Sequence, residues 1–138
     1  MRLVLDTNVL IAAYATRGQC REVLDHCLRA HEVVTAEVLL GELNEKLTRK
    51  LKFSVESARE LLTLLRSRVE IVDPPPLDPP TCRDPDDDWV LATAVEAGAQ
   101  CIVTGDKDLL VRHPFRSITI IPPGSFWRWE ASLAPEPG

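Results

Sequence analysis

The sequence lacks an excess of positive charge and any long apolar run. Its 138 residues include 21 acidic and 16 basic side chains, for a net charge of −5. A protein that binds nucleic acid through bulk charge alone is basic, so this balance argues against such a partner. The apolar opening reaches Asp6 almost at once, too short for a signal peptide, and no run is long enough for a membrane span. We therefore expect a cytoplasmic protein without a membrane segment.

Paired metal-binding spacings are also absent. The cysteines, Cys20, Cys27, Cys82 and Cys101, form no C-x-x-C pair, which argues against a zinc site. The histidines are scattered, and the sequence alone gives them no catalytic role. With 45% apolar and 27% charged residues, the chain has the composition and length of one globular domain spanning residues 1–138.

Apolar runs alternate with amphipathic segments along the chain, which is typical of an α/β domain with a mostly parallel, five-stranded sheet covered by helices on both faces. Prolines make residues 73–84 an extended connector, and residues 122–138 form a tail. Its aromatic segment 126–129 is expected to pack in the core or at an interface rather than stack on bases.

Short apolar runs predict strands at 2–5, 32–35, 69–72, 101–104 and 118–121. Helical spacing and capping residues predict helices at about 8–17 (capped by Thr7), 20–30, 36–51, from 54 onward, 89–97 and 107–112.

Carboxylates follow two of the predicted strands. Asp6 comes directly after the first strand, and Asp106 and Asp108 follow the fourth. In open α/β sheets the ligand site lies beyond the carboxyl ends of the strands. Each acid could instead cap the helix that follows it. For any single residue, both interpretations stay open.

Further acids lie on the predicted helices. Glu42 sits at the margin of a buried stripe, where a carboxylate is costly unless it has a partner, although it could also be a solvated residue on a helix edge. In the acidic run after the connector, Asp84 can cap the helix, and Asp86 and Asp87 complement its dipole. These effects leave Asp88 unexplained, so it is the preferred functional acid of the run.

Together the acids predict a metal site. At least four carboxylates near one sheet edge would repel one another and raise some of their pKa values. A hard divalent cation with oxygen ligands resolves that repulsion. Mg²⁺ or Mn²⁺ fits best, because no cysteine or histidine is positioned for a softer metal.

Four motifs in this order make the sequence resemble the PIN-domain ribonucleases, in particular the VapC-like toxins of toxin–antitoxin pairs. They are Asp6-Thr7-Asn8-Val9-Leu10, Glu37-Val38-Leu39-Leu40-Gly41-Glu42-Leu43, Asp88-Trp89-Val90-Leu91-Ala92-Thr93-Ala94 and Thr104-Gly105-Asp106-Lys107-Asp108-Leu109. The resemblance implies a three-layer α/β/α PIN-like fold. It also implies that the metal-binding and catalytic acids are Asp6, Glu42, Asp88 and Asp106, with Asp84, Asp87 and Asp108 as further candidate ligands. Thr7, Asn8 and Thr104 would orient the acids or bound waters.

The activity implied by this resemblance is metal-dependent hydrolysis of RNA phosphodiester bonds. A cognate antitoxin would block the site, and a homodimer is expected. Cations near the acids are candidates for phosphate contacts, or else form a solvated face: Arg17, Lys46, Arg49, Lys50 and Lys107. Four of the 21 acids belong to the predicted site, so we expect RNA binding to depend on the metal.

Two other classes of protein compete with this interpretation. One is a catalytically silent PIN fold that only binds RNA or protein. The other is a phosphorylation-dependent receiver, which would need paired acids after the first strand; Asp6-Thr7-Asn8 lacks the pair.

Overall fold

A five-stranded sheet forms the middle layer of the molecule in the computed structural model, which describes residues 1–133. Its neighbouring strands all pair in parallel, in the order β3-β2-β1-β4-β5. The α/β prediction is confirmed, and the sheet is wholly rather than mostly parallel. The strands are β1 (Arg2–Leu5), β2 (Glu32–Ala36), β3 (Glu70–Val72), β4 (Cys101–Val103) and β5 (Thr119–Ile121).

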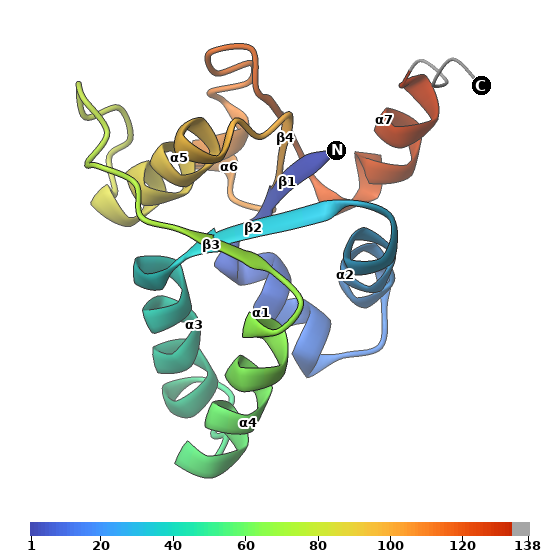
Figure 1. Cartoon of the computed structure of the whole chain (residues 1–138), viewed down its shortest axis with the longest axis vertical. Helices are drawn as coiled ribbons and strands as arrows, with labels where there is room; N and C mark the ends of the chain where they lie inside the picture. The colour runs from blue at the N-terminus through green and yellow to red at the C-terminus, as the bar shows by residue number, and fades with distance from the viewer. Residues whose placement is uncertain (134–138) are drawn as a thin grey trace.

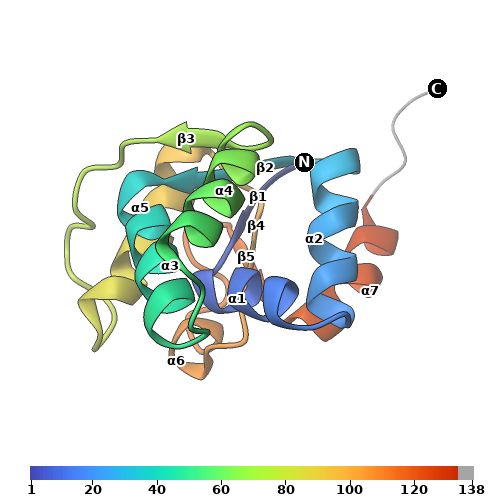
Figure 2. The same cartoon turned by 90° about the horizontal axis from the view of Figure 1, so that it is seen from below.

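Helices cover both faces of this sheet (Figures 1 and 2). Side chains alternate along a strand, so Leu3 and Leu5 of β1 enter one core and Val4 enters the other. The first core is shared with α1 (Thr7–Ala15), α2 (Gln19–Ala30), α3 (Glu37–Arg49) and α4 (Val55–Arg66). The second is shared with α5 (Pro85–Ala97) and α6 (Lys107–Leu110). Among the described residues, none of the helices combines the length and the apolar character needed to cross a bilayer.

Most predicted boundaries lie within a few residues of those observed, with two corrections. Helix α1 begins at Thr7, so Asp6 rather than Thr7 occupies the N-cap position. Helix α5 begins at Pro85, about one turn before the expected start at residue 89. The Asp84 carboxylate accepts a hydrogen bond from the Asp86 N–H at 2.9 Å and so caps the helix, which leaves Asp86, Asp87 and Asp88 in its first turn.

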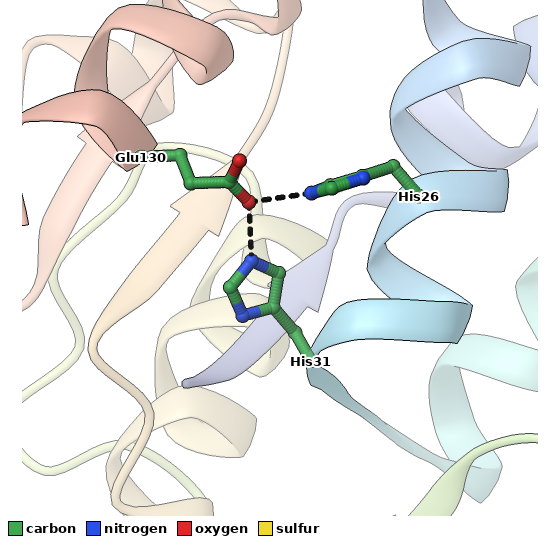
Figure 3. A group of neighbouring side chains, drawn as sticks. All are labelled: His26, His31 and Glu130. Carbon is green, nitrogen blue, oxygen red and sulfur yellow. Dashed lines mark hydrogen bonds and ion pairs between the residues drawn. The ribbon is translucent and has the colours of Figure 1, made fainter. Parts of the chain in front are cut away.

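The predicted tail from residue 122 contains two elements that the sequence reasoning missed, η1 (Pro123–Ser125) and α7 (Phe126–Ser132). The Phe126 side chain is fully buried in the core beneath α2. On the same helix, one Glu130 oxygen lies 2.6 Å from a ring nitrogen of both His26 and His31 (Figure 3). Part of the tail is therefore attached to the domain, while residues 134–138 lie outside the described residues.

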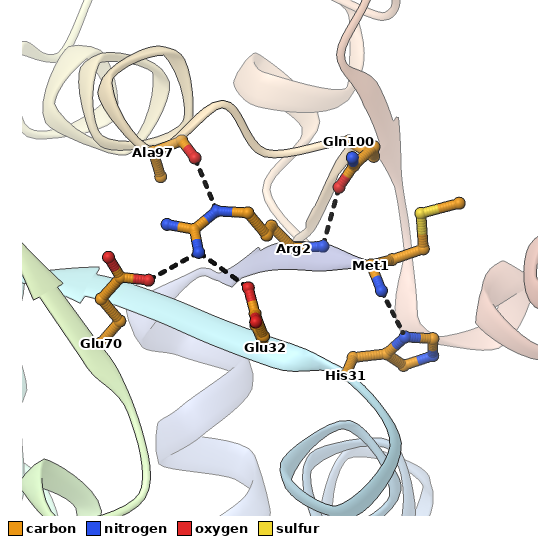
Figure 4. A network of polar contacts seen from close by, with 7 residues as sticks. All are labelled: Met1, Arg2, His31, Glu32, Glu70, Ala97 and Gln100. Carbon is orange, nitrogen blue, oxygen red and sulfur yellow. Dashed lines mark hydrogen bonds and ion pairs between the residues drawn. The ribbon is translucent and has the colours of Figure 1, made fainter.

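Arg2 links the amino ends of three strands to the end of α5 (Figure 4). Its Nε donates to the Ala97 carbonyl at 2.7 Å, and its Nη1 lies 2.8 Å from Glu32 Oε2 and 2.6 Å from Glu70 Oε2. The Arg2 backbone N–H also donates to Gln100 Oε1 at 2.7 Å. Because these contacts join β1, β2, β3 and α5, one side chain stabilises a whole edge of the sheet.

We expect Arg2→Met to lower the free energy of unfolding by about 1.5–3 kcal/mol, because it removes charged hydrogen bonds and leaves the Ala97 carbonyl without its donor. The matched control is Arg49→Met, since Arg49 pairs with Glu45 and both side chains are largely exposed, at 78% and 59%. That change should cost less than about 0.5 kcal/mol. Urea unfolding measures both, and equal losses would contradict the role given to Arg2.

Candidate active site

The order of the strands creates a crevice between β1 and β4. The chain leaves β1 toward β2 on one side and returns to β4 on the other, so the connections diverge between two neighbouring strands. Ligand sites of open parallel sheets lie at such a switch point, beyond the carboxyl ends of the strands. Asp6 follows β1 here, and its backbone N–H donates to the Val103 carbonyl of β4 at 2.9 Å. Thr104 and Asp106 follow β4, so the predicted acids from both strands meet at one edge.

A single buried hydroxyl connects these two strand ends. Thr104 Oγ1 donates to Asp6 Oδ2 at 2.8 Å and accepts from the Asp106 backbone N–H at 3.0 Å. Thr104 is fully buried, and Asp6 is only 5% exposed. Burial raises the pKa of the Asp6 carboxyl, the bond from Thr104 opposes that shift, and the charge of Glu42 adds to it. The hydrogen bond from Thr104 therefore holds the Asp6 carboxylate in one orientation.

From the acidic run, α5 places Asp87 beside the acids at the strand ends. Asp87 is buried on the first turn of the helix. Its pKa is raised to about 7, first by burial and then by the charges of Asp106, Asp84 and Asp6. Four carboxyl groups from three parts of the chain therefore influence one another electrostatically. Asp87 was one of the open alternatives to Asp88.

Asp88 makes different contacts. Its carboxylate accepts hydrogen bonds from the backbone N–H groups of Thr81, at 3.1 Å, and Cys82, at 2.8 Å. These bonds attach the end of the proline-rich connector to the start of α5. Successive residues of a helix point about 100° apart, so Asp87 and Asp88 serve different neighbours. From the sequence alone no structural reason is evident for an acid at position 88, and this contact with the connector is that reason.

The acids that follow β4 combine capping with proximity to Asp87. Asp106 Oδ1 accepts from the Asp108 N–H at 2.9 Å, so Asp106 caps α6. Asp87, Asp106 and Asp108 nevertheless each present an oxygen within 4.8 Å of the others. Asp108 also forms an exposed ion pair with Arg83 at 3.0 Å. Capping and participation in the acid cluster are therefore compatible at Asp106.

Glu42 reaches the site from α3 together with Lys46. Lys46 Nζ lies 2.9 Å from Glu42 Oε1 and donates to Asn8 Oδ1 at 2.9 Å. This lysine, predicted as a phosphate contact, thus neutralises one of the predicted metal ligands. Asn8 orients the lysine in this structure.

The other predicted cations divide into two groups. A depression of about 330 Å³ is lined by Glu42, Glu45, Lys46, Arg49, Lys50 and Asp86, so three of these cations continue from the site along α3. Lys107 is exposed at the first position of α6, beside Asp106. Arg17 lies beyond the end of α1, the end opposite to Asp6, and is not brought to the acids.

The donor set fits a hard divalent cation. Asp6, Asp87, Asp106 and Glu42 offer only oxygen atoms, the ligands that Mg²⁺ and Mn²⁺ prefer. Burial raises the pKa values of Asp6 and Asp87, and neighbouring carboxylates raise them further, so a bound cation would offset charge that the acids place on one another. The buried hydroxyl of Thr7, next to Asp6, has no hydrogen-bond partner among residues 1–133.

The sequence profile of the PIN domain matches residues 2–108, and the chain belongs to the PIN-domain family. The fold resembles VapBC2 from Rickettsia felis, solved with a DNA fragment from their promoter (17% identity; 88% of this chain and 98% of that chain covered; TM-score 0.64). It also resembles VapBC-1 from nontypeable Haemophilus influenzae (18%; 90% and 99%; 0.64). A third similar structure is VapC20 from Mycobacterium tuberculosis, a sarcin–ricin loop cleaving toxin (18%; 85% and 98%; 0.57). Comparison with curated proteins gives no match.

The raised pKa of Asp87 predicts how the stability of the metal-free protein depends on pH. The carboxyl titrates near its ordinary value when unfolded and at about 7 when folded, so the folded chain binds more protons in between. The free energy of unfolding should therefore fall as the pH rises from about 4 to about 7. In EDTA, Asp87→Asn should remove this part of the decline, and Asp86→Asn, an exposed neighbour, should retain it. Urea unfolding across this range measures both, and identical pH profiles would contradict the assignment.

Proposed function

We propose that this PIN domain is a metal-dependent endoribonuclease of the VapC-like toxin type, which hydrolyses phosphodiester bonds in RNA. The convergence of carboxylates from β1, α3, α5 and β4 on one crevice carries the proposal. Similarity to VapC20, a sarcin–ricin loop cleaving toxin, supports RNA as the substrate class.

In this proposal Asp6, Glu42, Asp87 and Asp106 hold Mg²⁺ or Mn²⁺, with Asp87 in the place first given to Asp88. Asp87 is favoured because it lies against Asp106, whereas the Asp88 carboxylate is occupied by two backbone N–H groups. When bound, the cation would neutralise charge on the attacked phosphate and lower the pKa of a bound water.

The chain's own groups would prepare the site. The Thr104 hydroxyl holds Asp6 in one orientation and ties it to Asp106, which limits the movement of two ligands at once. Lys46 forms an ion pair with Glu42 and offsets its charge. Arg49 and Lys50 extend positive charge along the depression beside Glu42, where phosphates of a bound strand would lie.

We expect purified protein to cleave RNA with Mg²⁺ or Mn²⁺ and to lose that activity in EDTA. Asp6→Asn should lower the cleavage rate by more than about 100-fold, because it removes a ligand, and Thr104→Val by about 10- to 100-fold, because it removes an outer partner. Gel-based cleavage of structured and unstructured RNAs measures both. Absence of cleavage with either metal across a broad RNA panel would favour the catalytically silent binding module.

The third acid is resolved by comparing Asp87→Asn with Asp88→Asn in the same assay. Asp87→Asn should match Asp6→Asn. Asp88→Asn keeps an oxygen that can accept the connector N–H groups, so it should retain most activity. The reverse order would return the assignment to Asp88.

We expect Arg49 and Lys50 to bind RNA phosphates. In an Asp6→Asn background, which prevents cleavage, a double change of both residues to Ala should weaken RNA binding. It should also reduce the slope of log affinity against log salt by about 0.7 for each phosphate that the protein no longer neutralises. The control removes the same charge elsewhere, through Arg29→Ala and Arg59→Ala at exposed positions of α2 and α4. An unchanged salt slope in the first variant would remove the proposed RNA path.

The proposed partners are a cognate antitoxin and a second copy of this chain. Similarity to the VapBC structures from R. felis and H. influenzae supports the first. A short open reading frame beside the gene would add to it. The homodimer and the cytoplasmic location remain predictions from the sequence.

A further inference from the structure

Three side chains from distant parts of the chain converge near the N-terminus, on the side of the sheet where β1 begins (Figure 3). His26 lies on α2, His31 directly follows that helix, and Glu130 lies on α7. The Nε2 atoms of both histidines lie 2.6 Å from the same oxygen, Glu130 Oε2. Both rings therefore direct a nitrogen toward one point.

We propose that His26, His31 and Glu130 form a second metal site, for a divalent transition metal such as Zn²⁺. Each residue offers one ligand atom, and the three atoms lie within 4.8 Å of one another. Two imidazoles and one carboxylate are a donor set that zinc accepts, whereas the acid site offers oxygen alone. The two sites would therefore prefer different metals.

The separation of the donors is close to that of a zinc site. With bonds of about 2.0–2.2 Å in a tetrahedral arrangement, neighbouring ligand atoms lie about 3.3–3.5 Å apart, so each nitrogen–oxygen distance must open by roughly 0.7–0.9 Å. Glu130 can supply this movement because it lies on a short helix and its side chain is 29% exposed. His31 is more enclosed, at 9% exposure, and would fix the position of the metal. The partial exposure of His26 and Glu130 leaves a fourth position for water.

The surroundings of the three residues suit metal binding. Burial raises the pKa of Glu130, but the hydrogen bonds from His31 and His26 outweigh that effect and lower it overall, so the carboxylate is ionised. The other ring nitrogen of His31, Nδ1, lies 3.3 Å from the N-terminal amine (Figure 4). A metal on Nε2 leaves the ring proton on Nδ1, so the amine must accept this hydrogen bond or move aside. Metal binding would thus engage the start of the chain as well as α2 and α7.

Phe126 shows what such a site would stabilise. This side chain, four residues before Glu130, is buried beneath α2 and stacks edge-on against the rings of His26 and His31. A metal that binds both histidines and Glu130 would hold α7 in this packed position. We therefore expect the site to be structural rather than catalytic.

The test uses the full chain without a polyhistidine tag, with excess Mg²⁺ present to occupy the acid site. Titration calorimetry should show one equivalent of Zn²⁺ bound, and Zn²⁺ should raise the melting temperature. The variants His26→Gln, His31→Gln and Glu130→Gln should each weaken Zn²⁺ binding by at least about tenfold. Glu22→Gln, an exposed acid of the same helix, is the matched control and should leave binding unchanged.

Two further measurements keep the result interpretable. A double variant, Asp6→Asn with Asp106→Asn, should still bind one Zn²⁺, which separates this site from the acid site. Glu130→Gln should cleave RNA as the unaltered protein does. The zinc site and the proposed nuclease activity can therefore fail separately, and the measurements show which of the two has failed. The absence of a Zn²⁺ equivalent, or an affinity in all three cluster variants equal to that of the unaltered protein, would show that the cluster only forms metal-free hydrogen bonds, and would overturn the proposal.

Discussion

The hydrogen bond from the Thr104 hydroxyl to Asp6 is the interaction on which the acid site depends. It lies at the edge where two neighbouring parallel strands both deliver residues to a crevice, because the chain leaves β1 and approaches β4 on opposite sides. The hydroxyl accepts from the Asp106 N–H at the same time. The Thr104 hydroxyl oxygen therefore couples the orientation of the Asp6 carboxylate to the position of the Asp106 backbone. Glu42 and Asp87 then arrive from helices packed on opposite faces of the sheet.

The distribution of charge explains why an acidic protein can carry this site. The net charge is −5, yet α3 carries three cations, Lys46, Arg49 and Lys50, which line one depression beside Glu42. Asp84, Asp86 and Asp87 occupy the first turn of α5 or its cap, where the helix dipole favours negative charge. Burial first and neighbouring carboxylates second raise the pKa values of Asp6 and Asp87. Local arrangement therefore decides the electrostatics more than the overall balance does.

Much of the fold could be predicted because local signals agree with the final packing. The run from Leu3 to Leu5 is buried on both faces, and Leu40, Leu43 and Leu47 of α3 repeat at helical spacing into one core. The edge shared by Asp6 and Asp106 followed from the rule for parallel sheets. These features depend on short-range patterns, or on topology that such patterns imply.

What the sequence could not reveal depends on contacts between distant segments. The difference between Asp87 and Asp88 depends on the connector, whose N–H groups donate to the Asp88 carboxylate. Helix α7 is only seven residues long and follows two prolines, so periodicity is weak there; the burial of Phe126 under α2 is what fixes it. Likewise, two histidines five residues apart at the end of a helix do not by themselves indicate a metal site. The cluster becomes visible only in the fold, where Glu130 lies beside both.

The separation of Thr104 from Asp6 also has a consequence for the order of events as the chain is made. The two residues are 98 positions apart, and their hydrogen bond requires β4 to pair with β1. Strands β1 and β2 can pair once the first 36 residues are available, but Asp6 then lacks its orienting partner and the acids of α5 and β4. A growing chain consequently has no complete acid site until Asp106 has emerged from the ribosome and β4 has folded against the first strand.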